Sequence, residues 1–299
     1  MNKGIWYGVG AYLAWGLFPV YWKLIDQVPA AQLIGHRIVW SFLTLLAIVL
    51  LSNQWRRFRA ATSNLRVLRL YVIAAVLITI NWFTYVWGVN SGYIFETSLG
   101  YFINPLVSVV FGVMVFGERL RRLQWTAVVL AASGVTYLTI AYGTLPWIAL
   151  VLAFSFGLYG MVKKLAPLGS TYGLTVETAI GLVPAVFYLL YVERQGRGAF
   201  LHVEAVSNAL LIGTGIVTTI PLLLFASAVR RTALSTMGVL QYIAPTLQLL
   251  LGVLVYREPF TSTQLVGFTI VWAALLVFGI DGVLMRGGAR GAVIDEGAG

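Results

Sequence analysis

Ten long apolar runs, separated by short polar or basic connections, dominate the sequence. A helix needs about 20 apolar residues to cross the ~30 Å hydrocarbon layer of a membrane. Runs of this length predict an all-α membrane protein with ten transmembrane helices, at residues 4–23, 31–52, 69–90, 95–116, 123–142, 146–162, 172–191, 208–229, 235–256 and 263–284. The connections 53–68 and 192–207 are the longest, and residues 286–299 are predicted to form a disordered tail.

The basic residues between the runs predict the orientation. If the amino terminus is cytoplasmic, fifteen lysines and arginines fall on the cytoplasmic side and four on the outer side, and Arg37 lies inside a helix. The cytoplasmic group is Lys3, Arg56, Arg57, Arg59, Arg66, Arg69, Arg119, Arg121, Arg122, Lys163, Lys164, Arg230, Arg231, Arg286 and Arg290; the outer group is Lys23, Arg194, Arg197 and Arg257. Because cytoplasmic loops are enriched in these residues, ten spans with both termini, and the tail, in the cytoplasm are expected.

One apolar pattern occurs twice. "YFINPLVSVVFGVMVFGERL" (101–120) returns as "QYIAPTLQLLLGVLVYREPF" (241–260), an offset of 140 at which Ile, Pro, Gly, Val, Val and Glu recur in the same order. Near the start of the chain "GLFPVYWKL" (16–24) lies over "GLYGMVKKL" (157–165). Such a register predicts two repeats, 1–142 and 143–285. Since each repeat holds an odd number of helices, five, the two are expected to be inverted in the membrane around a central cavity.

Composition excludes several classes of function. Hydrophobic residues make up 60% of the 299 residues and charged residues 10%, and the mean hydropathy is +0.88, which is typical of a membrane protein. There is no cysteine, and there are only two histidines. We therefore expect no metal site, no cofactor, no nucleic-acid partner and no enzymatic activity; an intramembrane transferase would need more acids within the spans.

Two repeat-related helix faces carry polar and small residues at helical spacing. Because such faces avoid lipid, they are candidates for the cavity wall, although close helix packing through small residues is the alternative. The first face holds Tyr101, Pro105, Ser108 and Gly112, the second Gln241, Pro245, Gln248 and Gly252. Each proline removes one backbone hydrogen bond and is predicted to break its helix. Candidate substrate-binding residues are Tyr101, Asn104, Ser108, Gln241, Gln248 and Asn81, together with the deep aromatics Trp15 and Tyr159. Trp82 is equally deep and could line the same pocket, and core packing is the alternative for all three aromatics.

Three titratable or charged residues lie about five residues into their predicted spans: His36, Arg37 and Glu177. A lone charge in hydrocarbon costs at least ~2.5 kcal/mol, so each needs a partner. We expect two gating contacts, His36 and Arg37 with Glu96 on the outer side, and Glu177 with Arg230 or a neighbouring base on the inner side. Permanent structural ion pairs are the alternative. As the one acid well inside a span, Glu177 is also the candidate for proton coupling.

Two further features are expected to be architectural. Glu118 and Glu258 end their helices, where an acid is badly placed for the helix dipole. Each should therefore contact nearby arginines or the amino terminus of another helix. Gly4 and Gly8 form a GxxxG face through which two copies of the chain could pack as a homodimer.

Several stretches resemble a known family. They are "WGLFPVYWK" (15–23), "GHRIVWS" (35–41), "NWFTYVWGVNSGYIFETSLGYFINPL" (81–106), "SFGLYGMVKK" (155–164) and "STMGVLQYIAPTLQLLLGVLVYREPF" (235–260). They are similar to RarD-type proteins of the EamA group in the drug/metabolite transporter superfamily. This resemblance implies a bacterial inner-membrane permease built from two EamA repeats, in a superfamily that exports amino acids, metabolites or drugs.

The functional expectation is a secondary transporter that exports small organic metabolites, amino acids or drugs by alternating access. Its partners are then a small-molecule substrate and membrane lipids. A non-transporting structural or regulatory membrane protein is the alternative.

Overall fold

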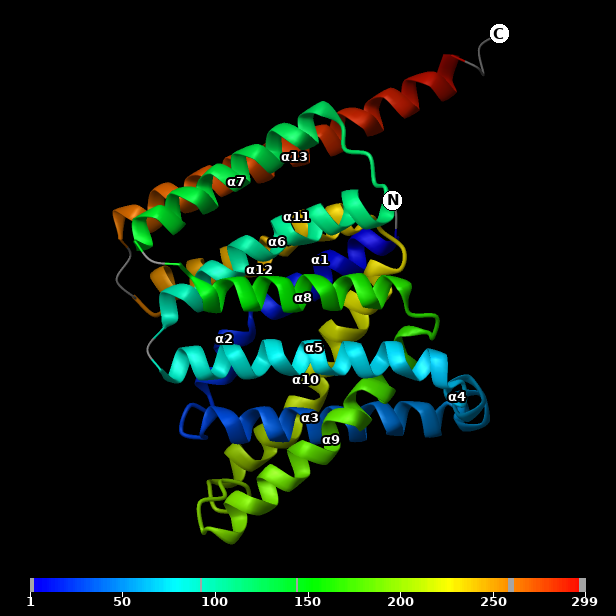
Figure 1. Cartoon of the computed structure of the whole chain (residues 1–299), viewed down its shortest axis with the longest axis vertical. Helices are drawn as coiled ribbons and strands as arrows, with labels where there is room; N and C mark the ends of the chain where they lie inside the picture. The colour runs from blue at the N-terminus through cyan, green and yellow to red at the C-terminus, as the bar shows by residue number, and fades with distance from the viewer. Residues whose placement is uncertain (1–2, 92, 144, 258–260, 296–299) are drawn as a thin grey trace.

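The computed structural model describes residues 3–91, 93–143, 145–257 and 261–295, and within these residues every regular element is a helix (Figure 1). The all-α class predicted from the sequence is confirmed. The elements are α1 (Lys3–Gly16), α2 (Phe18–Lys23), α3 (Ala30–Leu51), α4 (Trp55–Thr62), α5 (Leu65–Asn90), α6 (Ile94–Phe116), α7 (Arg122–Tyr142), α8 (Trp147–Leu165), α9 (Ser170–Arg194), α10 (Ala205–Val229), α11 (Leu234–Gln241), α12 (Ile243–Leu250), the π-helical turn η1 (Leu251–Val255) and α13 (Ser262–Asp295).

Eight helical segments of the described chain are long and apolar enough to cross a membrane. They correspond to the second to ninth predicted runs. In the first run α1 has only 14 residues, and in the tenth the apolar part of α13 spans Leu265–Asp281. Length and composition therefore support eight spans, and the ten-span arrangement stays a prediction.

The first predicted span is divided at Leu17. Pro19 lies in the first turn of α2, and its ring nitrogen has no hydrogen to offer the carbonyl of Trp15 four residues earlier. The side chain of Gln248 in α12 donates a hydrogen bond to this carbonyl instead, at 3.1 Å. The break is therefore stabilised by a residue 233 positions away in the chain.

The two predicted proline breaks differ. α11 ends at Gln241, whose carbonyl lies four residues before Pro245, and α12 begins at Ile243 after one residue in helical geometry, Tyr242. Pro105, in contrast, lies inside α6, which runs without interruption from Ile94 to Phe116. The prediction of a helix break at Pro105 is wrong, because one missing backbone hydrogen bond does not end a helix whose neighbours pack on both sides of it.

The helices form a layered bundle (Figure 1). α7 and α13 pair along one edge, α3 and α9 lie at the other, and the layers between them hold α6, α8, α1, α5 and α10. The largest buried cluster is central and draws on α1, α5, α8, α10 and α11, with Tyr12, Tyr159, Phe225 and Met237 fully buried.

The amino terminus, α4 and the connections α6–α7, α8–α9 and α10–α11 lie at one end of the bundle, to the right in Figure 1. We call this the basic end, since Lys163, Lys164, Arg230 and Arg231 lie there. The distal end is the opposite one.

The structure differs from the sequence-based expectation at the carboxyl-terminal tail and at Gly4 and Gly8. α13 continues to Asp295, so residues 286–295 of the predicted disordered tail are helical; no proline interrupts them. Residues 296–299 lie outside the described residues. Gly4 and Gly8 pack within the chain, where an added Cβ would lie 2.1 Å from the Thr232 hydroxyl and 3.0 Å from the Met237 sulfur.

Candidate functional site

A cavity of about 170 Å³ lies between the two halves of the chain. This volume has room for several water molecules or a small solute. Its wall takes residues from α1, α2, α3, α5 and α6 of the first half and from α8, α10, α11 and α12 of the second. The lining positions on α5 and α8, Ile78 to Tyr85 and Leu152 to Phe156, place the cavity between the middle of the bundle and its distal end.

Most of the predicted substrate-binding residues meet at this cavity. Six of the eight line it: Trp15, Asn81, Tyr101, Asn104, Gln241 and Gln248. Ser108 and Tyr159 are buried elsewhere, 5% and 1% exposed. Pro245 also lies in the wall, whereas Pro105 does not.

The polar side chains of the wall are held in different ways. The amide nitrogen of Asn81 donates to the Leu152 carbonyl at 2.9 Å and to the Ser155 hydroxyl at 3.0 Å, so its orientation is fixed by α8. Asn104 is 3% exposed, and its Oδ1 has no hydrogen-bond partner among the described residues. A buried amide oxygen without a partner is costly, and it can be satisfied by water or by a ligand in the cavity.

Arg37 enters the cavity from α3. Its Nε donates to the Thr218 hydroxyl at 3.1 Å. The guanidinium carbon lies 4.9 Å from the Trp22 ring centre, 4.8 Å from that of Trp82 and 5.8 Å from that of Phe18. These contacts are a hydroxyl and three π faces, so Arg37 does not form the predicted pair with Glu96.

The sequence did not single out three aromatic residues of the cavity wall. Phe18, Trp22 and Tyr85 lie in this wall beside Trp82 and Tyr101, and the rings of Tyr85 and Tyr101 lie edge to face at 5.8 Å. A signal for part of it was present, since Ile78, Asn81, Trp82 and Tyr85 follow the i, i+3, i+4, i+7 spacing of one helix face.

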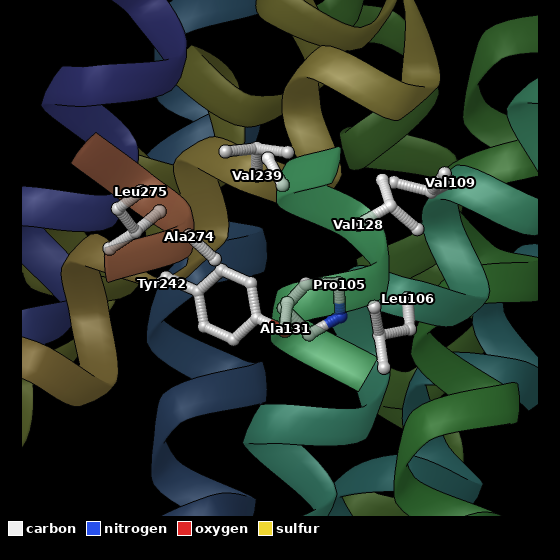
Figure 2. A pocket seen from close by; sticks show the side chains of 10 residues that line it. Pro105, Leu106, Val109, Val128, Ala131, Val239, Tyr242, Ala274 and Leu275 are labelled. Atoms are coloured by element: carbon white, nitrogen blue, oxygen red, sulfur yellow. The ribbon is translucent and has the colours of Figure 1, made fainter. Parts of the chain in front are cut away.

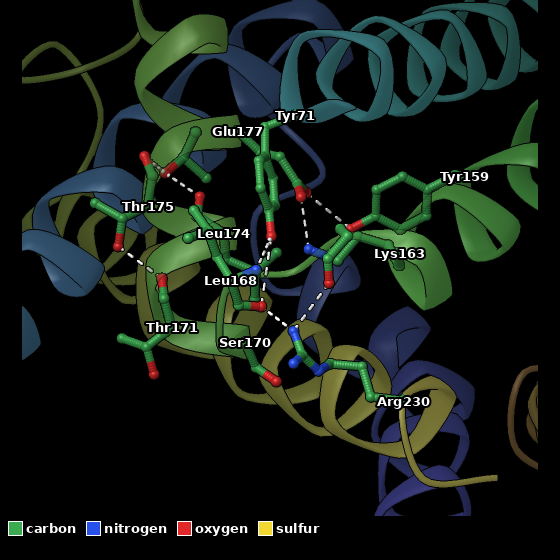
Figure 3. Close-up of polar contacts among 12 residues, drawn as sticks. Tyr71, Tyr159, Lys163, Leu168, Ser170, Thr171, Leu174, Thr175, Glu177 and Arg230 are labelled. Carbon is green, nitrogen blue, oxygen red and sulfur yellow. Dashed lines mark hydrogen bonds and ion pairs between the residues drawn. The ribbon is translucent and has the colours of Figure 1, made fainter. Parts of the chain in front are cut away.

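Glu177 forms a buried polar network with Lys163 and Tyr159 (Figure 3). On α8 these two residues lie nearer the basic end than the cavity-lining residues Leu152 and Phe156. Lys163 Nζ lies 2.5 Å from one carboxylate oxygen, and the Tyr159 hydroxyl donates to the other at 3.0 Å. The side chains of Lys163 and Glu177 are only 3% and 4% exposed. The predicted partner Arg230 instead donates to the carbonyls of Ala166, Pro167 and Leu168, so the base that pairs with Glu177 is its neighbour Lys163.

The residues of the predicted outer gate lie apart. His36 is buried against Phe200, with ring centres 5.1 Å apart. Glu96 Oε2 accepts a hydrogen bond from the Ile148 amide at 3.1 Å, in the first turn of α8. A carboxylate is stabilised at a helix amino terminus, where backbone N–H groups are free.

Glu118 stabilises the start of α11. The residue before that helix, Ala233, has no capping side chain. Glu118 accepts hydrogen bonds from the amides of Leu234 and Ser235 at 2.7 and 2.9 Å and pairs with Lys164 at 2.8 Å. Burial raises the pKa of this carboxyl, but the Lys164 pair and the bonds from Ser235 and Leu234 outweigh burial and hold the pKa below its ordinary 4.5. The expected contact with a neighbouring helix amino terminus is present; Glu258 lies outside the described residues.

Pro105 faces away from the cavity. Figure 2 shows it beside Leu106 and Tyr242 in a small apolar pocket of about 10 Å³, between α6, α7, α11 and α13. On the same helix Ser108 packs on α11, where a Cβ added to Gly238 would lie 3.0 Å from the Ser108 Cβ and 2.6 Å from the Pro105 carbonyl oxygen. We call the polar face of α6 (Tyr101, Pro105, Ser108 and Gly112) the α6 stripe. Close helix packing explains its Pro105 and Ser108 part.

Comparisons with known proteins agree with the motifs. The sequence pattern of the EamA-like transporter family matches residues 2–140 and again residues 145–280. "Uncharacterized transporter YojE" of Bacillus subtilis is 46% identical over 283 residues, covering 93% of both chains. "Protein RarD" of Streptomyces exfoliatus is 46% identical (94% of this chain, 89% of that protein), and "Protein RarD" of Escherichia coli is 41% identical (94% and 95%). A solved crystal structure that is 17% identical aligns with a TM-score of 0.69 over 94% of this chain and 97% of the other, which shows a shared fold.

Proposed function

The chain belongs to the EamA-like transporter family, and from this premise we propose that it is a secondary transporter that exports small organic solutes by alternating access. The cavity is the proposed substrate site. The proposed location is the bacterial inner membrane, with ten spans in two inverted repeats and both termini in the cytoplasm.

The helix contacts support the inverted-repeat proposal. The proposed repeats pair α1 with α8, α3 with α9 and α5 with α10. Under this pairing, the contact between α1 and α10 corresponds to the contact between α8 and α5, and the structure has both contacts. The contact of α3 with α10 likewise becomes that of α9 with α5, and both occur. The pairs α3–α9 and α7–α13 map onto themselves.

A pair of repeat-related cation–π contacts gives further support. Lys164 lies 5.0 Å from the Phe116 ring centre at the basic end. Offsets of 141 and 140 relate these residues to Lys23 and Tyr256, and Lys23 lies 3.9 Å from the Tyr256 ring centre. Equivalent contacts at the two ends are what two copies in opposite orientations would make.

The observation that carries the transport proposal is a cavity whose wall draws on both halves of the chain. Toward the basic end the rings of Phe156, Tyr159 and Phe225 pack at 5.4 to 6.0 Å, and the Lys163–Glu177 pair lies beneath them. Toward the distal end Tyr85 is 38% exposed. A rocking movement of one half against the other would open the basic end and close the distal end, with Glu177 as the proposed gating and proton-coupling residue.

The experiment uses the absence of cysteine from the chain. A single Ala244→Cys substitution places a thiol in the cavity wall, and Ala74→Cys places one in the closed core as the control. In oriented membrane vesicles a membrane-impermeant thiol reagent should modify Ala244→Cys from either side. Ala74→Cys should stay unmodified.

Solute flux in proteoliposomes completes the test. Modification from one side only, together with no solute flux, would favour the alternative of a non-transporting membrane protein. Solute flux that does not respond to an imposed pH gradient would contradict proton coupling through Glu177 but would still agree with a transport function.

A further inference from the structure

The cavity wall holds a cation, Arg37, that no acid of the described residues neutralises. Arg37 is the single charged residue among the described residues that line the cavity. Its Nε–H is used by Thr218, and within the described chain the donors on Nη1 and Nη2 have no hydrogen bond. The four ion pairs of the described residues lie elsewhere.

A guanidinium in this setting is a receptor for a planar anion. Its two outer nitrogens form a fork that matches the two oxygens of a carboxylate. The faces of Trp22 and Trp82 compensate part of the charge of Arg37, but a carboxylate would use the Nη donors directly. Since the site is partly shielded from bulk water, this contact is stronger than on an exposed surface.

The other residues of the cavity wall indicate which chemical groups would fit in the remainder of the ligand. Trp15, Trp82, Tyr101 and Phe156 supply flat apolar faces, and such faces favour aromatic or flat apolar groups. The unpartnered Oδ1 of Asn104 is an acceptor for one hydroxyl or N–H on that body.

We propose that this cavity selects small organic monocarboxylates with an aromatic or flat apolar body, and that Arg37 binds their carboxylate. The proposal rests on the transport function above and names its substrate class. Arg37 thereby becomes a substrate-binding residue and not a partner of Glu96 in a gate.

The single positive charge of the described cavity wall determines which other solutes would bind less tightly than a monocarboxylate. A zwitterionic amino acid brings an ammonium group, for which the described wall has no carboxylate. A doubly charged phosphate brings a second negative charge, for which the wall has no second cation. Neutral amides and alcohols leave the Nη donors unused.

The test compares three probes of similar size on the full chain in detergent, by isothermal titration calorimetry: phenylacetate, its neutral isostere phenylacetamide, and phenylalanine. We expect wild type to bind phenylacetate at least tenfold more tightly than either of the others. Arg37→Gln should bind phenylacetate and phenylacetamide equally, whereas Arg37→Lys should keep a weaker preference. Lys23→Gln, which removes a cation outside the cavity, should leave the preference unchanged.

Equal binding of phenylacetate and phenylacetamide by wild type overturns the proposal, as does undiminished preference in Arg37→Gln or the absence of binding by every probe. The comparison in wild type needs no variant, so a folding failure of Arg37→Gln leaves the test intact. Trp15→Leu is a second check, since the Trp15 ring lines the cavity and is not among the rings that contact Arg37, and its loss should weaken both probes and leave their ratio unchanged.

The two proposals can fail separately. Carboxylate preference without flux of phenylacetate into proteoliposomes would contradict transport and leave the binding site in place. Alternating accessibility of Ala244→Cys with no carboxylate preference would contradict the substrate class alone.

Discussion

The α6 stripe and its repeat-related counterpart on α11 and α12 have similar sequences and different surroundings. On α12, Pro245 and Gln248 face the cavity, and the chain is broken at Tyr242 and wound into a π-helical turn at Leu251–Val255. On α6 the equivalent Pro105 and Ser108 are packed against α11, and the helix is unbroken. We call the part of the second face that lines the cavity, Pro245 and Gln248, the wet stripe, and the packed part of the α6 face, Pro105 and Ser108, the dry stripe; Tyr101 of the α6 face lines the cavity.

This difference shows where the two halves of the molecule differ in conformation. The dry stripe lies beside the contacts that seal the basic end, where Glu118 holds α11 and Lys163 pairs with Glu177. The wet stripe lies beside the open part of the cavity. If the two halves exchange conformations during transport, the α6 stripe should become wet when the α12 stripe becomes dry. Four substitutions test this comparison.

The largest effect is expected at the buried ion pair on the dry side. Lys163→Met leaves Glu177 buried without a cation, and breaking a buried pair in this way costs about 3–5 kcal/mol. The double variant Lys163→Met/Glu177→Gln should recover a large part of the loss, because no unpaired charge remains. Thermal unfolding in detergent measures both, with exposed Lys3→Met as the control. A double variant no more stable than Lys163→Met would show that the pair is not the stabilising element.

Gly238→Ala should disturb the dry stripe by sterics alone. Its new Cβ would lie 2.6 Å from the Pro105 carbonyl oxygen, and overpacking of this kind costs about 1–3 kcal/mol. The control is Gly160→Ala, whose Cβ would meet its nearest neighbour at an ordinary 3.6 Å. We expect a lower unfolding temperature and faster modification of Ala244→Cys from the basic side in Gly238→Ala. The same values in both glycine variants would show that α6 and α11 are not in close contact.

Glu118→Gln removes the charge at the start of α11 and should cost about 1 kcal/mol at pH 7. Because the pKa of Glu118 is lowered in the folded protein, its carboxylate stabilises the fold above pH 4.5, and this contribution is lost as pH falls through the lowered pKa. The unfolding temperatures of wild type and Glu118→Gln should therefore converge below pH 4.5. A gap that does not narrow as the pH falls below 4.5 would assign the effect to side-chain shape.

The smallest effects are expected at single polar groups of the two stripes. Gln248→Leu removes the hydrogen bond to the Trp15 carbonyl at the cavity, which should cost about 0.5–1.5 kcal/mol of stability. Because it also changes a polar group of the cavity wall, we expect a lower affinity for phenylacetate in calorimetry. Ser108→Ala, on the dry stripe, should leave that affinity unchanged. Equal losses in both variants would contradict the division into wet and dry stripes.

The helices and most of the cavity wall were predictable from sequence, because lipid imposes long apolar runs and excludes polar stripes from its surface. Asn81, Tyr101, Gln241 and Gln248 were found by that rule. The partner of Glu177 was not, since four bases lie at the same end and only the side-chain geometry of Lys163 decides among them.

The asymmetry between the stripes was also beyond sequence reasoning. Pro105 and Pro245 occupy the same place in the repeat, and the tertiary surroundings of the two helices differ: Pro105 packs between α6, α7, α11 and α13, whereas Pro245 lines the cavity. The surroundings of Arg37 were missed for a related reason. Its contacts, Thr218 on α10 and Trp22 on α2, come from segments far away in the chain.

The attachment of Glu118 to α11 has a consequence for how the molecule is made. The bonded residues are 116 positions apart, so the carboxylate leaves the ribosome long before the helix that it caps. Until then the loop after α6 holds an acid without its final partners, and α11 on emerging has no side chain of its own to begin the helix. Closure of the basic end is therefore one of the last steps of biogenesis, and a nascent chain stalled before residue 234 should leave Glu118 open to chemical modification.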